Sequence, residues 1–196
     1  IALNRTQQKE EYRRYKVVSE TLVAKRDGSK EPLNIEKLHK AVFYACEGIT
    51  GVSASEVEIK SQIQFYNGIS TKEIQETLIK AASDLISEET PNYQFVGGRL
   101  INYALRKEVY GQFEPWHVKR LVEKNIERGF YDPELLEYYS DEEWDRINSF
   151  IKHERDENLT YVAMEQLRGK YLCQNRVSGE IFETPQMCYV LIAATL

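Results

Sequence analysis

A chain of 196 residues with a net charge of −5 has the length of one large domain or of two small ones. Such a length buries roughly 70% of the unfolded surface, so the fold needs no disulfide staples. The acidic balance excludes a general attraction to nucleic acid, and any anion site must be built locally. We expect no membrane contact, because no stretch reaches the ~18 apolar residues of a spanning helix.

The three cysteines, Cys46, Cys173 and Cys188, are scattered and form no Cys-x-x-Cys pair. This usage argues for a reducing compartment, and against a disulfide framework, a zinc ribbon or another metal site. The chain begins with Ile and ends in an apolar run, so it looks cut out of something longer. Residues 1–20 are rich in charge and are expected to form an N-terminal extension.

The first organised stretch, residues 22–37, predicts two short strands, a tight turn and the start of a helix. Asp27-Gly28 is a hairpin-turn pair because Gly tolerates positive φ, and Pro32 suits an edge strand. Asn34 is expected to cap the helix, whose N-terminus attracts anions through its N–H groups and dipole. The pattern indicates a polyphosphate site, with a basic surface turn as the alternative. Three cations converge on this helix start: Lys25, Arg26 and Lys37.

The rest of the first half predicts a compact unit of four helices, separated by capping and stop signals. We expect these helices over about 34–47, from a Ser53–Glu56 capping box to near Gly68, from Ser70 or Thr71 through Ile86, and from Thr90-Pro91 to Tyr110-Gly111.

The second half is also predicted to be mainly helical, beyond a junction over 111–115. The expected order is a helix over 115–128, a short helix after Asp132-Pro133, a helix from a Ser140 capping box to about Ile151, a helix over about 158–168, a hairpin over 171–182 and a last helix from Thr184-Pro185.

Two motifs make residues 21–111 resemble the ATP-cone, the nucleotide-sensing module of ribonucleotide reductases. Val-x-Lys-Arg-Asp-Gly stands at 23–28, and Leu-Arg-Lys-x-x-Tyr-Gly stands at 105–111. The resemblance continues into the helical N-terminal region of the class I large (alpha) subunit, of the bacterial and T-even-phage kind. The motifs that carry this second part are Tyr110–Pro115, Lys152–Asp156, Gly169–Leu172 and Glu180–Gln186.

The resemblance implies a mainly α fold in three parts. Residues 1–20 form the extension, and residues 21–111 form the cone, a β-hairpin plus a four-helix unit. Residues 112–196 begin the helical region of the large subunit and stop before the catalytic barrel. The family's radical and redox cysteines would lie in that barrel, so we expect this chain alone to be inactive and assign it no catalytic residue.

The resemblance also implies which residues hold ATP or dATP, with Mg²⁺ expected to accompany the nucleotide. The nucleotide-binding residues would be Lys25, Arg26, Glu31, Pro32, Leu33, Asn34, Ile35, Glu36, Lys37, Thr71 and Lys107. Contacts to the base or to a second nucleotide would come from Lys40, Tyr44, Phe65, Ile74, Gln75 and Tyr103. Such donors suit a triphosphate, which only accepts hydrogen bonds.

The implied function is allosteric control of a cytoplasmic ribonucleoside-diphosphate reductase, which makes deoxyribonucleotides for DNA synthesis. The expected partners are the rest of the large subunit, a second large subunit, the radical-bearing small (beta) subunit, and thioredoxin or glutaredoxin as the reductant. The alternative is a transcription repressor that senses nucleotides through an ATP-cone. Such repressors carry a four-cysteine zinc ribbon ahead of the cone, and residues 1–20 contain no cysteine.

Overall fold

The computed structural model describes residues 21–25, 28–62 and 64–196. The extension expected over 1–20, together with Arg26, Asp27 and Ile63, lies outside the described residues. The described chain has a two-stranded hairpin followed by helices, which confirms the mainly α class. It divides into two compact units, the first ending at Leu100 and the second running from Ile101 to Leu196. This division falls inside one helix, and the domain boundary after Gly111 stays a prediction.

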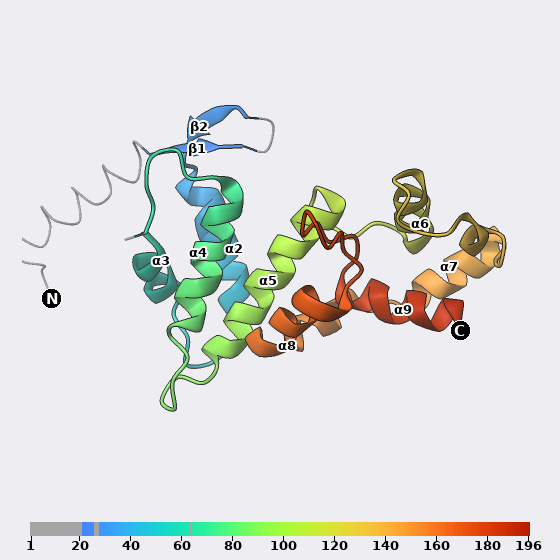
Figure 1. Ribbon diagram of the computed structural model, residues 1–196. Helices are drawn as coiled ribbons and strands as arrows, with labels where there is room; N and C mark the ends of the chain where they lie inside the picture. The colour runs from blue at the N-terminus through green and yellow to red at the C-terminus, as the bar shows by residue number, and fades with distance from the viewer. Residues whose placement is uncertain (1–20, 26–27, 63) are drawn as a thin grey trace, which may run out of the picture. The chain divides into compact units, whose positions relative to one another are not determined.

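The hairpin forms where the sequence places it (Figure 1). Strand β1 (Leu22–Ala24) pairs antiparallel with β2 (Lys30–Pro32), and Gly28 has the positive φ of +82° that the turn favours. On its other side, β1 bonds the segment before helix α4, with 3.0 Å from the Ala24 N–H to the Ile69 carbonyl. Strand β2 is therefore the edge strand, which suits Pro32.

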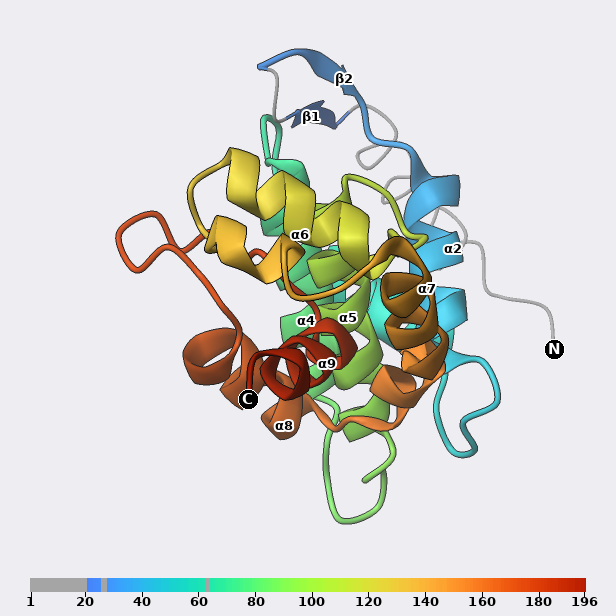
Figure 2. The ribbon, with the colours of Figure 1, turned by 90° about the vertical axis from the view of Figure 1, so that its right-hand side faces the viewer.

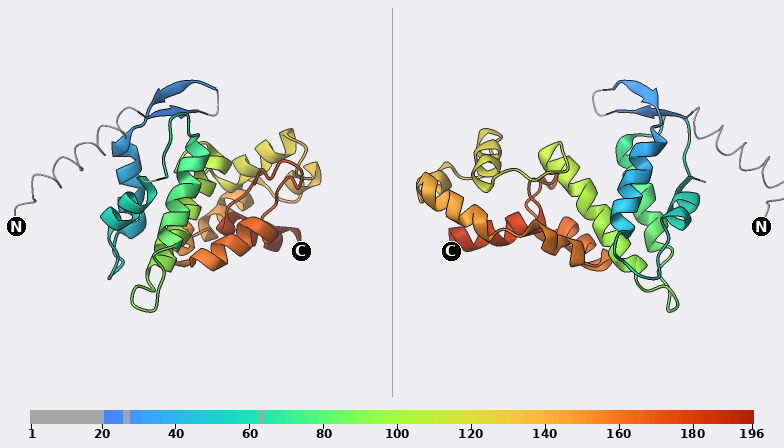
Figure 3. Two further views of the ribbon diagram at one scale, coloured as in Figure 1. Left: turned by 60° about the vertical axis from the view of Figure 1, so that its left-hand side comes forward. Right: turned by 180° about the vertical axis from the view of Figure 1, so that it is seen from behind.

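Two helices begin beside the hairpin: α2 (Ile35–Cys46) and α4 (Thr71–Ser83). Figure 1 and both views of Figure 3 show the hairpin lying at the ends where these helices start, and Figure 2 shows the same for α2. Asn34 caps α2 as predicted, and Ser70 rather than Thr71 caps α4. Their buried faces are apolar and include Leu38, Ala41, Val42, Ala45, Ile74, Leu78, Ala81 and Ala82.

Helix α3 (Ala54–Gln62) corrects two predictions. The Ser53–Glu56 capping box does not form, because the Tyr93 hydroxyl lies between its two members. The Ser53 N–H donates to the Tyr93 hydroxyl at 2.9 Å, and that hydroxyl donates to the Glu56 carboxylate. The helix also ends at Gln62, before the expected stop, so Phe65 lies outside it.

Helix α5 (Tyr93–Tyr110) begins later than Thr90-Pro91 predicts. The Thr90 hydroxyl donates to the Leu85 carbonyl at 2.7 Å instead of capping the helix. The predicted end is confirmed, since Gly111 follows with a φ of +69°.

Besides the last part of α5, the second unit contains four helices and three short helical turns among its described residues. They are α6 (Val118–Glu127), η1 (Pro133–Leu136), α7 (Asp141–Phe150), η2 (His153–Asn158), α8 (Tyr161–Gln166), η3 (Leu167–Tyr171) and α9 (Pro185–Thr195).

Two predictions for this unit need correction, and a third is confirmed. The helix expected from 115 starts at Val118, where His117 accepts from the Lys119 N–H. The helix expected over 158–168 is a short helix and a π turn, because Thr160 caps α8 and starts it at Tyr161. The expected hairpin over 171–182 forms as a short antiparallel pairing. Gln174 bridges Ile181, the Asn175 N–H donates to the Glu180 carbonyl at 2.9 Å, and the Phe182 N–H donates to the Cys173 carbonyl at 3.0 Å.

The segment over 180–186, one of the motifs of the sequence, lies largely inside the second unit. Glu183 is 5% exposed, and its carboxylate accepts from the Tyr131 hydroxyl at 2.6 Å and from the Cys173 N–H at 2.8 Å. The Thr184 hydroxyl bonds the Tyr110 hydroxyl at 2.8 Å. These bonds satisfy polar groups that would otherwise be costly to bury.

Candidate nucleotide-binding site

Lys25 directly follows β1 and faces the opposite strand of the hairpin. Its ammonium lies 2.7 Å from the Glu31 carboxylate, and the two side chains are 37% and 42% exposed. The Lys25 N–H also donates to the Ser29 carbonyl at 2.8 Å, which fixes the backbone at the turn. The hairpin thus holds a half-exposed cation in a defined place.

The start of α2 adds hydrogen-bond donors to this cation. Asn34 Oδ1 accepts from the Lys37 N–H at 2.9 Å, and both side chains are exposed. A helix start also presents N–H groups that lack an intrahelical acceptor. Lys37, in the first turn, adds a second positive charge, so this end of α2 suits an anion.

The start of α4 is different, because it already holds a carboxylate. Ser70 and Glu73 form a reciprocal capping box, and Glu73 also accepts from the Tyr66 hydroxyl at 2.7 Å. Hydrogen bonds from Ser70, and then from Tyr66, lower the pKa of Glu73 to about 2. Thr71 begins this helix half-buried, so its hydroxyl is a neutral donor beside an occupied helix end.

Neither this capping box nor the bond from Tyr66 to Glu73 was predicted from the sequence. Ser-Thr-Lys-Glu at 70–73 has the spacing of a capping box and could have been found. The bond from Tyr66 leaves no such signal, because it depends on how the segment before α4 folds back.

Residues expected near the base or at a second nucleotide lie on several elements of the first unit. Lys40 and Glu36 form an exposed pair at 2.8 Å, whose hydrogen bond raises the pKa of Lys40 and lowers that of Glu36. Tyr44 on α2 and Gln75 on α4 are half-buried. Phe65 is half-buried between α3 and α4, and Ile74 is buried in the core.

The two remaining expected residues, Tyr103 and Lys107, lie on the part of α5 that belongs to the second unit. The Lys107 ammonium lies 5.6 Å from the centre of the Tyr103 ring, and that ring packs against Phe113 with 5.4 Å between centres. Burial raises the pKa of Tyr103. Lys107 and Tyr103 are thus brought together, within their own unit.

Neither a metal centre nor an activated thiol is evident in the part of the chain that the structure describes. No group of three or more His, Cys, Asp or Glu side chains there could hold a metal ion. Burial raises the pKa of Cys46 to about 11 and that of Cys188 to about 12, and it also raises the pKa of Cys173. These thiols stay protonated at neutral pH, as packed side chains would.

Comparison with known proteins identifies the class of this hairpin-and-helix unit. The family model of the ATP cone domain matches residues 21–108. The first part of the chain is therefore an ATP cone domain, and its hairpin, α2 and α4 are the elements described above.

Alignment of the chain as a whole with individual proteins extends this identification. The chain is 52% identical over 175 residues to the ribonucleoside-diphosphate reductase 1 subunit alpha of Escherichia coli (strain K12), and 49% identical over 175 residues to the subunit alpha of Haemophilus influenzae. The subunit alpha of Enterobacteria phage T4 is 40% identical over 176 residues. Each alignment covers 89% of this chain and 23% of the relative. Over its aligned part, the chain belongs with the ribonucleoside-diphosphate reductase alpha subunits.

The comparisons confirm the resemblance on which the sequence analysis rested, and they do not favour the transcription repressor. The chain spans about a quarter of the length of these relatives. None of the helices in the described residues is both long and apolar enough to cross a membrane.

Proposed function

We propose that the first unit binds ATP or dATP at its hairpin, and that this binding controls a ribonucleoside-diphosphate reductase. The observation that carries the proposal is the meeting of Lys25 and the starts of α2 and α4 at one hairpin, inside an ATP cone domain. The reductase names of the relatives supply the enzyme class.

The triphosphate is held mainly from the side of α2. Lys25 leaves Glu31 to bind a phosphate, and Lys37 and the first N–H groups of α2 bind another. The Glu73 carboxylate already occupies the start of α4, so this helix contributes only the neutral Thr71 hydroxyl to the phosphates. The segment over 31–37 forms the wall of the site, and Mg²⁺ accompanies the triphosphate. Arg26 and Lys107 are proposed as phosphate contacts on the resemblance alone.

A base pocket and a second nucleotide site complete the proposal. Phe65 and Ile74 are proposed to contact the base. A second adenine nucleotide would use Lys40 for phosphate and Tyr44, Gln75 and Tyr103 for the base, since a tyrosine ring can stack on it.

The whole protein is proposed to be a cytoplasmic reductase large subunit whose catalytic thiols lie outside this chain. It would work as a dimer of large subunits with a radical-bearing small subunit, and thioredoxin or glutaredoxin would reduce it. In that setting, ATP switches activity on and dATP switches it off.

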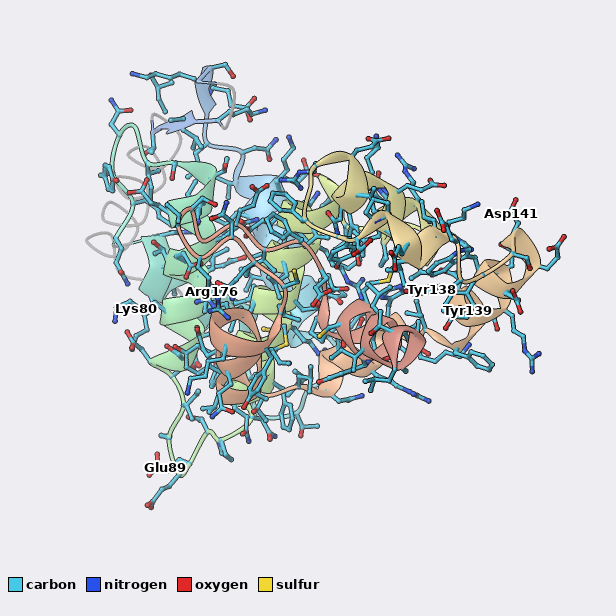
Figure 4. All side chains as sticks on the ribbon, turned by 45° about the vertical axis from the view of Figure 1, so that its right-hand side comes forward. Lys80, Glu89, Tyr138, Tyr139, Asp141 and Arg176 are labelled. Atoms are coloured by element: carbon cyan, nitrogen blue, oxygen red, sulfur yellow. The ribbon has the colours of Figure 1, made fainter. Side chains whose placement is uncertain are left out.

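Isothermal titration calorimetry of the 196-residue chain with ATP and with dATP tests the proposal. We expect binding of both nucleotides, weakened by about 1.5–3 kcal/mol in Lys25→Ala and in Lys37→Ala, the size of a lost hydrogen bond to a charged group. Lys80→Ala is the matched control, because Lys80 lies near the opposite end of α4 from Thr71 and pairs with Asp84 (Figure 4).

No heat and no thermal shift at millimolar nucleotide would overturn the proposal. Equal weakening by Lys80→Ala would mean that the chain attracts nucleotides through its general charge and has no built site.

A further inference from the structure

The segment that runs from the end of helix α8 through η3 and the loop after it carries uncompensated positive charge. Residues 166–179 contain three cations and no acidic residue, in a chain whose net charge is −5. Arg168 is paired with Glu165 at 2.6 Å. Lys170 and Arg176 are both exposed, and neither makes an ion pair with a residue that the structure describes. Two free cations therefore lie on the surface of the second unit.

The fold holds these two cations close together. Arg176 Nη1 donates to the Gly169 carbonyl at 3.4 Å, and Nη2 donates to the Lys170 carbonyl at 3.1 Å. The guanidinium thus covers carbonyls at the end of η3, a position that favours a cation. These bonds use only part of the donors of the guanidinium, and both go to neutral acceptors, so its charge and its other N–H groups remain for an anion.

Exposed apolar side chains lie next to the two cations in the chain. Tyr171, which follows Lys170, is 66% exposed, and Val177, which follows Arg176, is 98% exposed. Tyrosine and arginine are enriched among the residues that contribute most to binding between proteins. We call Lys170, Tyr171, Arg176 and Val177 the basic surface. Its composition fits a protein surface that offers carboxylates beside an exposed aromatic ring.

The second unit itself carries such a surface. Residues 132–145 contain seven acidic residues and no cation. Some of these acids are engaged within the unit, in ion pairs and helix caps. Glu137 and Glu142 are exposed and form no ion pair within the described part of the chain, and Tyr138 beside them is 57% exposed. We call Glu137, Tyr138 and Glu142 the acidic surface, which matches the two free cations and the tyrosine of the basic surface.

The two surfaces lie apart on the second unit. Figure 2 shows the loop over 173–180 on one side of α9 and helix α7 on the other side. Figure 4, which labels Arg176, Tyr138 and Asp141, also shows Arg176 at a different end of this unit from the two others. The surfaces therefore do not meet within one copy of the chain, and both remain free to meet the opposite surface of another copy.

We propose that the basic surface binds the acidic surface of a second copy of this chain. The two free cations of one copy pair with the two free carboxylates of the other, and Tyr171 and Tyr138 supply apolar contact area. Because the two surfaces differ, the contact is head-to-tail. Exposed ion pairs are weak and are screened by salt, so the association is weak and sensitive to salt. This contact is separate from the nucleotide site and requires no nucleotide.

Sedimentation velocity of the nucleotide-free 196-residue chain, over a range of concentrations at low and at high salt, tests the inference. The average mass of the wild type should rise with concentration at low salt, and high salt should weaken this association at least tenfold. Lys170→Glu with Arg176→Glu reverses the basic surface, and Glu137→Lys with Glu142→Lys reverses the acidic surface. Each double variant alone should associate at least tenfold more weakly than the wild type at low salt.

An equimolar mixture of the two double variants should associate again, because each reversed or native surface then finds its opposite on the other variant. Lys152→Glu with Arg155→Glu is the control, since it changes the net charge as much as the basic-surface variant does. These two exposed cations lie outside both surfaces, and the control should associate as the wild type does. Circular dichroism melts check that every variant is folded.

A wild type that stays monomeric at low salt up to millimolar concentration would overturn the inference. Association that survives either reversal would overturn it too, because another surface would then join the copies. A mixture of the folded double variants that fails to associate would equally exclude the pairing of these two surfaces. Absence of ATP binding would overturn the proposed function and leave this contact unaffected.

Discussion

Lys25 and Glu31 are diagonal neighbours across the hairpin, and their side chains meet at 2.7 Å. The register pairs Ala24 with Lys30, so Lys25 lies opposite Ser29. Glu31 is two residues beyond Ser29 and its side chain is therefore on the same face of the hairpin as that of Lys25. The cation proposed to bind phosphate is therefore already bound by a carboxylate. Phosphate must displace this carboxylate before it can pair with Lys25.

Glu31→Gln should bind ATP more tightly than the wild type, because it removes the carboxylate that competes with phosphate for Lys25. The gain should be only about two- to fivefold, since a half-exposed ion pair is weak. Calorimetry at one fixed ionic strength measures the difference. Lys25→Ala combined with Glu31→Gln should show no such gain. Weaker binding by Glu31→Gln would mean that its carboxylate contacts the nucleotide directly.

Glu73 should make the first unit less stable in acid. Its pKa is lowered from 4.5 to about 2 in the folded chain, so its stabilising effect is present above pH 4.5 and is lost as the pH falls towards 2. Urea unfolding at several pH values measures the free energy of unfolding. This free energy should fall less between pH 4.5 and pH 2 in Glu73→Gln than in the wild type. Glu89→Gln, at an exposed position, should follow the wild type (Figure 4).

Asp156→Asn should stabilise the chain at neutral pH. Burial raises the pKa of Asp156 from 3.8 to about 6, so folding favours the protonated form, and stability is lost as the pH rises through 6. Asn does not ionise, and the variant should gain on the order of 2 kcal/mol at pH 7.5 and almost nothing at pH 4. Denaturant unfolding at the two pH values measures this gain. An equal gain in stability at both pH values would mean that the gain comes from packing and not from the removed charge.

The 196-residue chain should reduce no ribonucleotide when small subunit, thioredoxin and a ribonucleoside diphosphate are added. The pKa of Cys46 is raised to about 11 and that of Cys188 to about 12, so neither offers a thiolate near pH 7.5. Slow alkylation by iodoacetamide, mapped by mass spectrometry, should accompany the absent turnover. Deoxynucleotide formation would require a thiol role for one of the three cysteines.

A full-length large subunit that carries this cone should form a larger assembly with dATP than with ATP. The two nucleotides differ by one hydroxyl, worth only ~1 kcal/mol as a hydrogen bond, whereas an almost complete switch needs ~5.5 kcal/mol. Several identical cones in one symmetric assembly can add up such small differences. Sedimentation with the small subunit compares the masses, and equal masses would exclude this mechanism. Substitution of Tyr44, Gln75 or Tyr103 should change the size of the effect.

The sequence alone predicted the local elements of the cone well. The turn at Gly28, the cap at Asn34, the buried face of α2 and the end of α5 before Gly111 were all correct. Each depends on residues within a few positions of one another, through the left-handed freedom of glycine, a capping side chain or helical spacing. Such signals are complete within a short stretch of chain.

Tertiary structure decided what depended on residues far apart in the sequence. The Tyr93 hydroxyl, 40 positions along the chain from Ser53, takes the place of the capping box predicted there. Arg106 and Asp156 lie within motifs of the sequence, but only the fold shows that both are buried with atoms left unpaired. A side chain forms such contacts only where the fold brings a distant partner within reach, and removal from water then makes each unpaired charge costly.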